Sequence, residues 1–518
     1  MPRTNAGHSE ESPLIRRKGC WFAAATVPFL LIGLLFPLEN WLGARHLAKT
    51  KARLESAGIT LASERLLPAL PPEEENFGAA PVLRALAEND KSHPGVWAAD
   101  ETEKWRRPEI DGKTYFIRLP HAKNPVSPDW EEIHRNLVGA PPPESITAPE
   151  NLAKLLEEKA GAIFAELENY LPRPCAMVPP GALARWQDQS EPRKSDPMKI
   201  ISFGDVLKLR FFLALANRDP DRAAKSWLIQ WRFAELMEHE KGIPMAVIGM
   251  ALRFVNLDSL KFALRERYLA PQAMREIQRH LSGFNGQTSL EFSLRFNCIE
   301  IPEDIERLRR SPASILQFFD TPSLPAWDWL PGGGWDDYFA ELAEFTPKGW
   351  FDFNEAAYLQ AHASLLQLVQ DTSRPDRFST ASLEAAVPEK SGFPYHERYA
   401  AELFSMTLRY FQRQAELITA TRLAEAACAL ECYHQAHQEY PPGLPHLIPD
   451  FLKKLPLDFD GNSIRYAKTP ENGRYQLWSV GVDGTDDGGK KGAINFGIPK
   501  AAGTSGKSAD LVWEYGQQ

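Results

Sequence analysis

The sequence contains little cysteine, which excludes a scaffold built on disulfides. Only five cysteines occur among 518 residues, and an odd number leaves at least one of them unpaired. Basic residues do not outnumber acidic ones, since 59 Lys and Arg face 68 Asp and Glu for a formal net charge of −9. Nucleic-acid binding depends on basic residues that neutralise phosphates. The composition therefore argues against a nucleic-acid partner.

The sequence also lacks the short motifs of common nucleotide and hydrolase sites. It has no G-x-S-x-G elbow, no P-loop, no H-E-x-x-H pair and no dinucleotide fingerprint. We therefore expect no nucleotide partner and assign no catalytic or cofactor-binding residues, although the absence of motifs does not exclude an enzyme. A content of 43% hydrophobic and 25% charged residues is typical of a globular protein.

A long uncharged run lies near the beginning of the sequence. Residues 20–38 carry no charge and, at about 1.5 Å per residue, nearly cross a hydrocarbon layer of about 30 Å as a helix. Trp21 and Trp41 stand at the two ends, where indole rings prefer the water interface. We predict a transmembrane helix at residues 20–42 that enters a lipid bilayer, preceded by a cytoplasmic tail at residues 1–19.

Two other interpretations of this run remain open. A cleaved signal peptide would use Arg16, Arg17 and Lys18 as its basic flank, but the apolar run is longer than the usual core of such peptides. A lipoprotein anchor at Cys20 would need an apolar attachment signal, and basic residues precede this cysteine instead.

Membrane orientation follows the positive charges that flank a span, and here they are nearly balanced. The basic group before the span abuts it, and a long domain follows the span. Long domains are translocated largely regardless of charge. We therefore expect a single-pass protein of a bacterial inner membrane with a periplasmic body. The flanking residues are Arg3, Arg16, Arg17 and Lys18 before the span and Arg45, Lys49, Lys51 and Arg53 after it.

The body is expected to be mainly α-helical, because apolar residues recur at three- and four-residue spacing. Residues 43–150 are rich in proline and predict a juxtamembrane helix, a loop layer and one strand at 114–119. Residues 151–395 predict a helical-hairpin bundle, since a helix pair has no second copy at the period of a solenoid. Helices are expected at residues 79–88, 152–171, 203–216, 221–239, 243–267, 271–281 and 353–370.

Individual residues predict where several helices begin or end. Gly58 is placed to end the juxtamembrane helix. Asp219 or Asp221 is available as the N-cap of the helix that follows a turn. Glu303 and Glu306 follow Pro302 and indicate a helix start, where carboxylates suit the helix dipole.

The last part of the chain, residues 396–518, changes character. A long Ala-rich helix is expected at residues 397–439, and short strands are expected at 463–468 and 475–479. We expect Trp478 and Tyr466 to cover the helix. This order predicts an α+β module made of a long helix and a small antiparallel sheet.

Three phrases in this module carry a family resemblance: RLAEAACALECYHQAHQEYPPGL, LIPDFLKKLPLDFDGNSIRY and YQLWSVGVDGTDDGG. Together, within residues 422–489, they resemble the C-terminal half of type II secretion major pseudopilins and related pilin-like proteins. The resemblance implies a helix laid on a small sheet and a calcium site in a late loop. The whole chain also resembles uncharacterised single-pass bacterial envelope proteins, which implies no known activity.

The late loop contains three carboxylates beside glycines that let the chain close around a hard cation. Lys490 and Lys491 follow where the pseudopilin family supplies a further aspartate. The alternative interpretation is a surface loop whose acids form Asx turns with their own backbone. The candidate calcium ligands are Asp483, Asp486, Asp487, the carbonyl of Leu477 and the hydroxyl of Ser479.

Two cysteines and two histidines near the end of the long helix include the residue types that bind zinc. Cys428 and Cys432 lie on the opposite side of a helix wheel from His434 and His437, so the four side chains do not converge on one metal ion. We expect the cysteines in the core and the histidines on the wetter side.

The aromatic belt at residues 326–353 combines indole rings with carboxylates, as a polysaccharide-cleaving cleft would require. The alternative is that its rings fill a gap between two helical layers, because aromatic burial is common. The residues are Trp327, Trp329, Trp335 and Trp350 with Asp328, Asp336 and Asp337.

The sequence therefore predicts a membrane-anchored envelope protein of non-catalytic, contact or assembly type that meets an envelope protein partner. The alternative is an envelope enzyme that acts on polysaccharide through the tryptophan-rich region.

Overall fold

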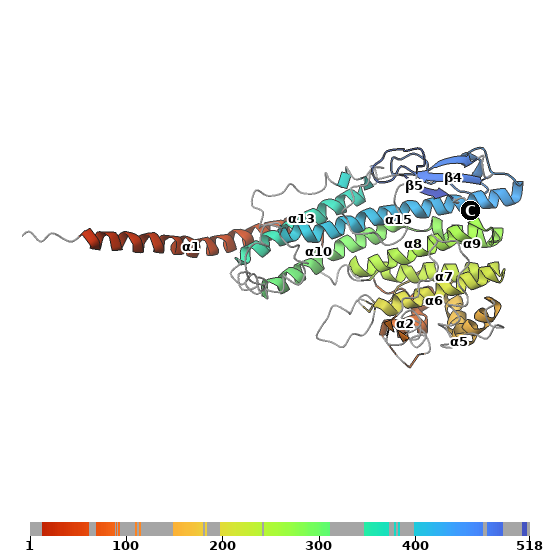
Figure 1. Ribbon diagram of the computed structural model, residues 1–518, viewed down its shortest axis with the longest axis horizontal. Helices are drawn as coiled ribbons and strands as arrows, with labels where there is room; N and C mark the ends of the chain where they lie inside the picture. Colours follow the sequence, from red (N-terminus) through yellow and green to blue (C-terminus); the bar gives the residue numbers. More distant parts are fainter. Residues whose placement is uncertain are drawn as a thin grey trace, which may run out of the picture. The chain divides into compact units, whose positions relative to one another are not determined.

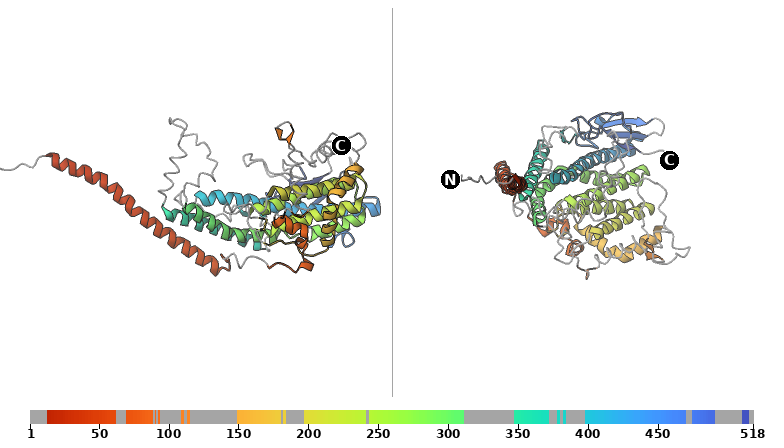
Figure 2. Two further views of the ribbon diagram at one scale, coloured as in Figure 1. Left: turned by 90° about the horizontal axis from the view of Figure 1, so that it is seen from below. Right: turned by 60° about the vertical axis from the view of Figure 1, so that its left-hand side comes forward.

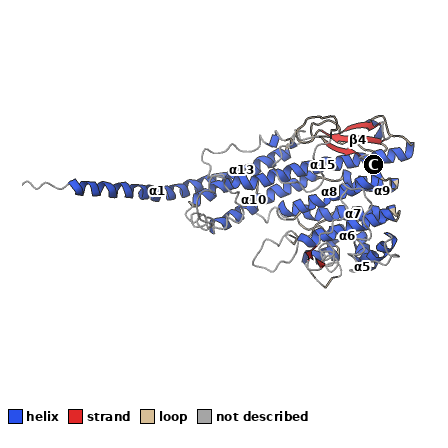
Figure 3. Ribbon diagram, viewed as in Figure 1, coloured by secondary structure: helices blue, strands red, loops and turns tan. Residues whose placement is uncertain are grey.

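The computed structural model is mainly helical, with a small antiparallel sheet near the C-terminus (Figure 3). This confirms the predicted fold class at that level. The structure describes residues 13–61, 69–88, 90, 92–93, 109–110, 113–114, 149–179, 182–183, 197–240, 243–310, 347–371, 378–379, 382–383, 398–469, 474–490 and 510–514.

The helices expected from apolar periodicity are present, with small differences at their ends. The helices described are α1 (Pro13–Ser56), α2 (Pro81–Glu88), α5 (Pro149–Tyr170), α6 (Pro197–Ala216), α7 (Pro220–Glu238), α8 (Ile243–Arg265), α9 (Pro271–Ser282), α10 (Gly286–Arg310), α13 (Lys348–Gln370) and α15 (Arg398–His437).

The chain forms two compact units, each built from segments that are distant in sequence. Unit 1 contains Met1–Leu61, Glu300–Ala361 and Pro388–Phe404. Unit 2 contains Ala62–Ile299, His362–Val387 and Ser405–Gln518. Compact units and consecutive chain segments therefore do not coincide, and the domain boundaries expected from the sequence remain a prediction.

The first helix, α1, runs without interruption from Pro13 to Ser56 (Figure 2). It includes both the predicted span and the juxtamembrane helix, so the expectation that one continues into the other is confirmed. Gly58 has a φ of 78° and its N–H donates to the carbonyl of Glu55 at 3.0 Å. Glycine adopts this left-handed conformation without steric cost, so Gly58 ends the helix as predicted.

Within unit 1, α1 approaches the start of α13 at two glycines. A Cβ atom on Gly43 would overlap the backbone of Gly349, and one on Gly349 would overlap the backbone of α1. The N–H of Gly349 donates to the side-chain oxygen of Asn40 at 2.8 Å. The amide of Gln360 donates to the hydroxyl of Thr50 at 3.0 Å, so the contact extends along both helices.

In unit 2, α7 packs between α6 and α8 (Figure 1). Asp219 caps α7 by accepting the N–H of Arg222 at 3.0 Å, which confirms one of the two predicted caps. The indole N–H of Trp227 donates to the carbonyl of Asn256 at 2.9 Å, and the Asn256 amide returns a bond to the carbonyl of Trp227 at 3.1 Å. These paired bonds fix the register of α7 against α8.

The segment after α5 is held in place by the buried side chain of Asn76. Its side-chain oxygen accepts the N–H of Met177 at 2.9 Å and that of Gly78 at 3.0 Å. Its amide donates to the carbonyl of Met177 at 2.9 Å. Residues 171–174, which precede this clamp, are thereby positioned beside α7.

The C-terminal sheet is antiparallel in the order β3 (Arg465–Thr469), β4 (Arg474–Ser479), β5 (Leu511–Glu514), and it lies along α15. The hydroxyl of Tyr475 donates to the carbonyl of Ala427 on α15 at 3.3 Å. Leu477 is fully buried on the same face, and its register partner Tyr466 shares that face. Trp478 alternates to the opposite face, so the expectation that it covers the helix was wrong.

Helix α10 differs from the expectation, because Pro302 lies inside it and does not start it. Leu290, Leu294 and Cys298 are fully buried at four-residue spacing, and Ile305 is buried beyond the proline. Burial of this stripe on both sides of Pro302 outweighs the one backbone hydrogen bond that the ring removes.

A short hairpin stands near the strand expected at residues 114–119. It pairs β1 (Glu109–Ile110) with β2 (Lys113–Thr114) in antiparallel register. Thr114 belongs to both the expected and the observed strand, and residues 115–119 lie outside the described residues.

One buried carboxylate joins the loop after α15 to the sheet. Asp458 accepts hydrogen bonds from the hydroxyl of Ser479, from the N–H of Val480 at 3.0 Å and from the guanidinium of Arg465. Arg465 also pairs with Asp460. The side chain of Asp458 is 0% exposed and that of Asp460 is 26% exposed.

We expect Asp458→Asn to lower the free energy of unfolding by about 3 kcal/mol, because it breaks a buried ion pair. Asp460→Asn is the matched control on the same arginine and should cost about 1 kcal/mol or less, because that pair is partly screened by water. Urea unfolding of both variants measures the difference, and equal losses would contradict the assignment of Asp458 as the anchor.

Candidate functional site

The predicted calcium loop is closed by hydrogen bonds between its own groups. Asp483 accepts the N–H of Thr485 at 3.0 Å. Asp486 accepts the N–H of Gly488 at 2.9 Å and the indole N–H of Trp478 at 3.0 Å. These bonds lower the pKa of Asp486 below its ordinary value. The acids thus form turns of the kind named in the alternative interpretation.

The other predicted ligands have structural partners, and one nearby acid was missed. Leu477 is a fully buried residue of β4, and the hydroxyl of Ser479 donates to Asp458. Asp510 accepts the N–H of Asp487 at 3.2 Å and that of Gly489 at 2.7 Å. It was missed because it follows the loop by more than twenty residues, so sequence spacing did not connect it.

Metal ligands do not cluster in the part of the chain that the structure describes, where no group of three or more His, Cys, Asp or Glu side chains is placed to hold an ion. Cys428 and Cys432 are buried in α15, whereas His434 is partly exposed and His437 is exposed. This confirms the expected placement of the four side chains. The aromatic belt lies mostly outside the described residues, which resume at 347 and include Trp350 of α13.

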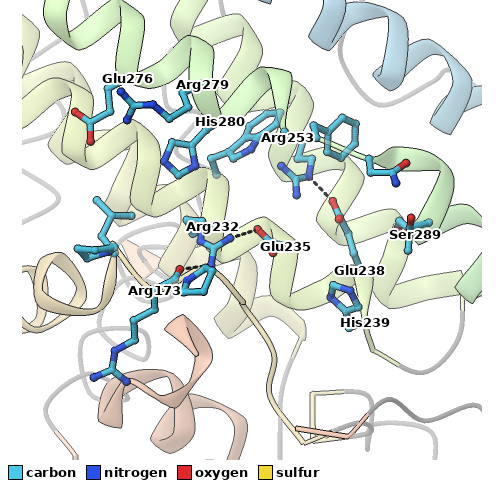
Figure 4. Close-up of a pocket in the computed structure, with 18 of the residues that line it drawn as sticks. Arg173, Arg232, Glu235, Glu238, His239, Arg253, Glu276, Arg279, His280 and Ser289 are labelled. Atoms are coloured by element: carbon cyan, nitrogen blue, oxygen red, sulfur yellow. Dashed lines mark hydrogen bonds and ion pairs between the residues drawn. The ribbon is translucent and has the colours of Figure 1, made fainter. Parts of the chain in front are cut away.

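Unit 2 contains a cavity of about 810 Å³ that no sequence motif indicated (Figure 4). Its walls come from α7, α8, α9, the start of α10 and the segment after α5. Charged side chains dominate the polar part of the lining: Glu168, Arg173, Lys225, Arg232, Glu235, Glu238, Arg253, Glu276 and Arg279.

The deepest of these charges is Arg253 of α8, which is 1% exposed. Its guanidinium Nε donates to Glu238 of α7, and Figure 4 shows the two side chains pointing toward one another. The guanidinium carbon lies 4.2 Å from the ring centroid of Trp231 and 4.5 Å from that of Phe284. A carboxylate and two aromatic faces thus compensate a charge that would be costly to bury alone.

A second arginine of the lining, Arg232 of α7, connects two parts of the cavity wall. Arg232 donates to Glu235 at 2.6 Å and to the backbone carbonyl of Arg173 at 2.8 Å (Figure 4). Arg173 is held on the ring of Tyr170, with 3.4 Å between the guanidinium carbon and the ring centroid. The arginine therefore joins α7 to the loop that Asn76 clamps.

Burial and neighbouring charge shift the pKa of two cavity residues. Burial raises the pKa of Glu235 despite the neighbouring arginine. Burial, with Arg232 and Arg279 nearby, lowers the pKa of His280 from 6.5 to about 4. His280 is therefore neutral at pH 7 and is surrounded by positive charge.

Sequence reasoning missed the cavity because its residues read as ordinary polar positions on amphipathic helices. One signal was present in α8. This helix is long and apolar enough to cross a membrane by length and composition, and 61% of its apolar window is buried in the structure. An arginine in the middle of so apolar a helix needs a buried partner, and Glu238 is that partner.

The arrangement is suited to binding. Two of its acids, the partly buried Glu235 and the buried Glu238, are each hydrogen-bonded to an arginine. Buried arginines with unused N–H groups attract oxygen acceptors.

We expect the wild-type protein to lose stability relative to His280→Gln as the pH falls from about 6.5 to about 4. In this window the unfolded state binds a proton at His280 that the folded state does not, so acid favours unfolding. Melting temperatures of both proteins across this range provide the measurement. Parallel curves for the two proteins would contradict a depressed pKa.

The comparisons with known proteins add no relative, since no family model, no curated protein and no solved structure matches this chain.

Proposed function

We propose that this chain is a single-pass envelope protein that acts by contact or assembly and not by catalysis. In this proposal α1 crosses a bacterial inner membrane and the remainder of the chain lies in the periplasm. The helical-hairpin body and the pilin-like module are the parts that meet an envelope partner.

The observation that carries the proposal is a run of exposed apolar side chains on α1. Water-exposed apolar groups of this size in one helix are unfavourable unless they contact lipid or another protein. The guanidinium of Arg45 lies 5.3 Å from the ring centroid of Trp41, an arrangement typical of a water interface. The exposed residues are Leu34 at 69%, Leu35 at 46%, Leu38 at 51%, Trp41 at 56% and Leu42 at 39%.

Helix α8 is the other apolar candidate, but it belongs to a packed core. Its residues Leu257, Leu260 and Ala263 are almost fully buried in unit 2. A helix that is apolar on most faces is typical of either a membrane span or a protein core. Its neighbours α6 and α7 supply the protein core, so α1 is the membrane segment in this proposal.

The contact role is supported by the C-terminal module. The sheet packs on α15 through Tyr475 and Leu477, as expected of a helix laid on a small sheet. This arrangement agrees with the pseudopilin resemblance in layout.

We expect the full chain to stay in the membrane pellet after washing with high salt or carbonate and to dissolve in detergent. The double variant Leu35→Glu with Leu38→Glu should release it, because charges in the hydrocarbon layer are costly. Leu457→Glu is the matched control, since Leu457 is also exposed, at 55%, but lies in unit 2.

The orientation is measured in the same membranes. An impermeant maleimide should label Lys468→Cys in intact spheroplasts above the background of the native cysteines, since Lys468 is exposed on β3. Wild-type protein in the salt-washed supernatant, or labelling only after lysis, would contradict the proposal.

A calcium ion at the Asp483–Asp487 loop completes the proposal. Asp510 supports it, because this carboxylate lies against the backbone of Asp487 and Gly489 and adds an acid to the loop. Burial raises the pKa of Asp510, and the neighbouring acids Asp486 and Asp487 raise it further. A divalent cation would relieve that repulsion.

We expect calcium to raise the melting temperature of the full chain by a few degrees relative to a chelator, and Asp510→Asn to remove that difference. Magnesium at the same concentration is the control cation, because it prefers a smaller octahedral site. Identical melting curves with calcium and with chelator would contradict the calcium site and leave the alternative interpretation, a loop of Asx turns.

A further inference from the structure

We propose that the cavity of unit 2 binds a small organic anion, held by the guanidinium edge of Arg253 and enclosed by the aromatic and proline side chains of the cavity wall. The site goes beyond the contact role proposed above and does not depend on it, since every lining residue belongs to unit 2.

The size and lining of the cavity suit a ligand larger than a single inorganic ion. Its volume of about 810 Å³ falls within the range of about 300 to 1,000 Å³ that is typical of small-molecule pockets. Apolar surface comes from Leu171, Pro172, Pro174, Trp231 and Phe284. A ligand with one anionic end and one apolar end would match both parts of this lining.

Arg253 supplies the recognition group. Its Nε is used by Glu238, but its Nη1 is buried without a hydrogen-bond partner among the described residues. Leaving such a donor unpaired costs about 1–3 kcal/mol, and more for a charged group. A ligand oxygen at this position would remove that cost.

The aromatic neighbours restrict how a ligand approaches this arginine. Trp231 and Phe284 both lie within 4.5 Å of the guanidinium carbon. Their rings occupy space beside the guanidinium, so in this proposal a ligand oxygen meets its in-plane N–H edge. A planar fork of N–H groups matches the paired oxygens of a carboxylate or a phosphate.

The charges around the cavity favour an anion. The lining holds five basic side chains and four acids, and three of these acids, Glu168, Glu235 and Glu238, already have basic partners, which leaves Glu276 as the fourth. Buried Nε of Arg232 and Nδ1 of His239 also have no hydrogen-bond partner in the part of the chain that the structure describes. Burial lowers the pKa of His280, and the nearby charges of Arg232 and Arg279 lower it further.

Carboxylate and phosphate share this chemistry, and two probes distinguish them. We would titrate the full chain in detergent with phenylacetate and with phenyl phosphate by calorimetry. Phenylacetamide is the neutral control, and inorganic phosphate tests whether the apolar end contributes. We expect at least one of the two anions to bind at least tenfold more tightly than phenylacetamide and more tightly than inorganic phosphate.

Two matched arginine variants test the assigned group. Arg253→Lys keeps the charge but loses the planar fork, and we expect it to weaken binding of the preferred anion at least tenfold. Arg465→Lys is the control, because Arg465 also pairs with a buried carboxylate, that of Asp458, but neither residue lines this cavity. It should bind the anion with an affinity close to that of the wild-type protein.

Melting curves show whether each variant is folded before binding is compared. If Arg253→Lys fails to fold, Trp231→Leu, which removes one ring beside the same guanidinium, replaces it with the same expected loss. A folded wild-type protein that binds neither anion, equal losses in the cavity variant and Arg465→Lys, or equally tight binding of phenylacetamide would each overturn the proposal. None of these results bears on membrane attachment, so the two proposals fail separately.

Discussion

The ion pair between Arg253 of α8 and Glu238 of α7 is the interaction on which the cavity depends. Either charge alone would be too costly to bury, and breaking such a pair costs about 3–5 kcal/mol. The pair therefore fixes which faces of the two helices meet. Further along the interface between α7 and α8, the buried polar groups of Trp227 and Asn256 also find partners, because the two residues exchange hydrogen bonds. Because these polar contacts hold α7 and α8 in one register, the space beside them is not filled by closer packing of the helices.

Much of the fold could be predicted from the sequence because it depends on local patterns. Apolar spacing located most helices of unit 2 but missed the first half of α10, and Asp219 marked the start of α7 because its side chain accepts the N–H of Arg222. Pro302 misled because proline usually begins a helix, whereas here burial on both sides keeps the helix continuous. Strand β5 at Leu511–Glu514 is short and pairs with a strand far away in the chain, so periodicity could not show it.

The site was less predictable, because it depends on pairs that are distant in the chain or lie on different helices. In the sequence, Glu238 and Arg253 are each ordinary helix residues. Only the packing of α7 against α8 brings them together as an ion pair. Asp510 reaches the loop at Asp487 in the same way. The sequence predicted the acids that are neighbours in the chain, and it missed those that the fold brings together.

The uninterrupted course of α1 has a mechanical consequence. The helix is continuous from Pro13 to Ser56, and Gly43 and Gly349 bring its backbone directly against that of α13. Rotation of the N-terminal half about its own axis is therefore transmitted to the rest of unit 1 as torque. Unit 1 would therefore turn together with α1 as one body.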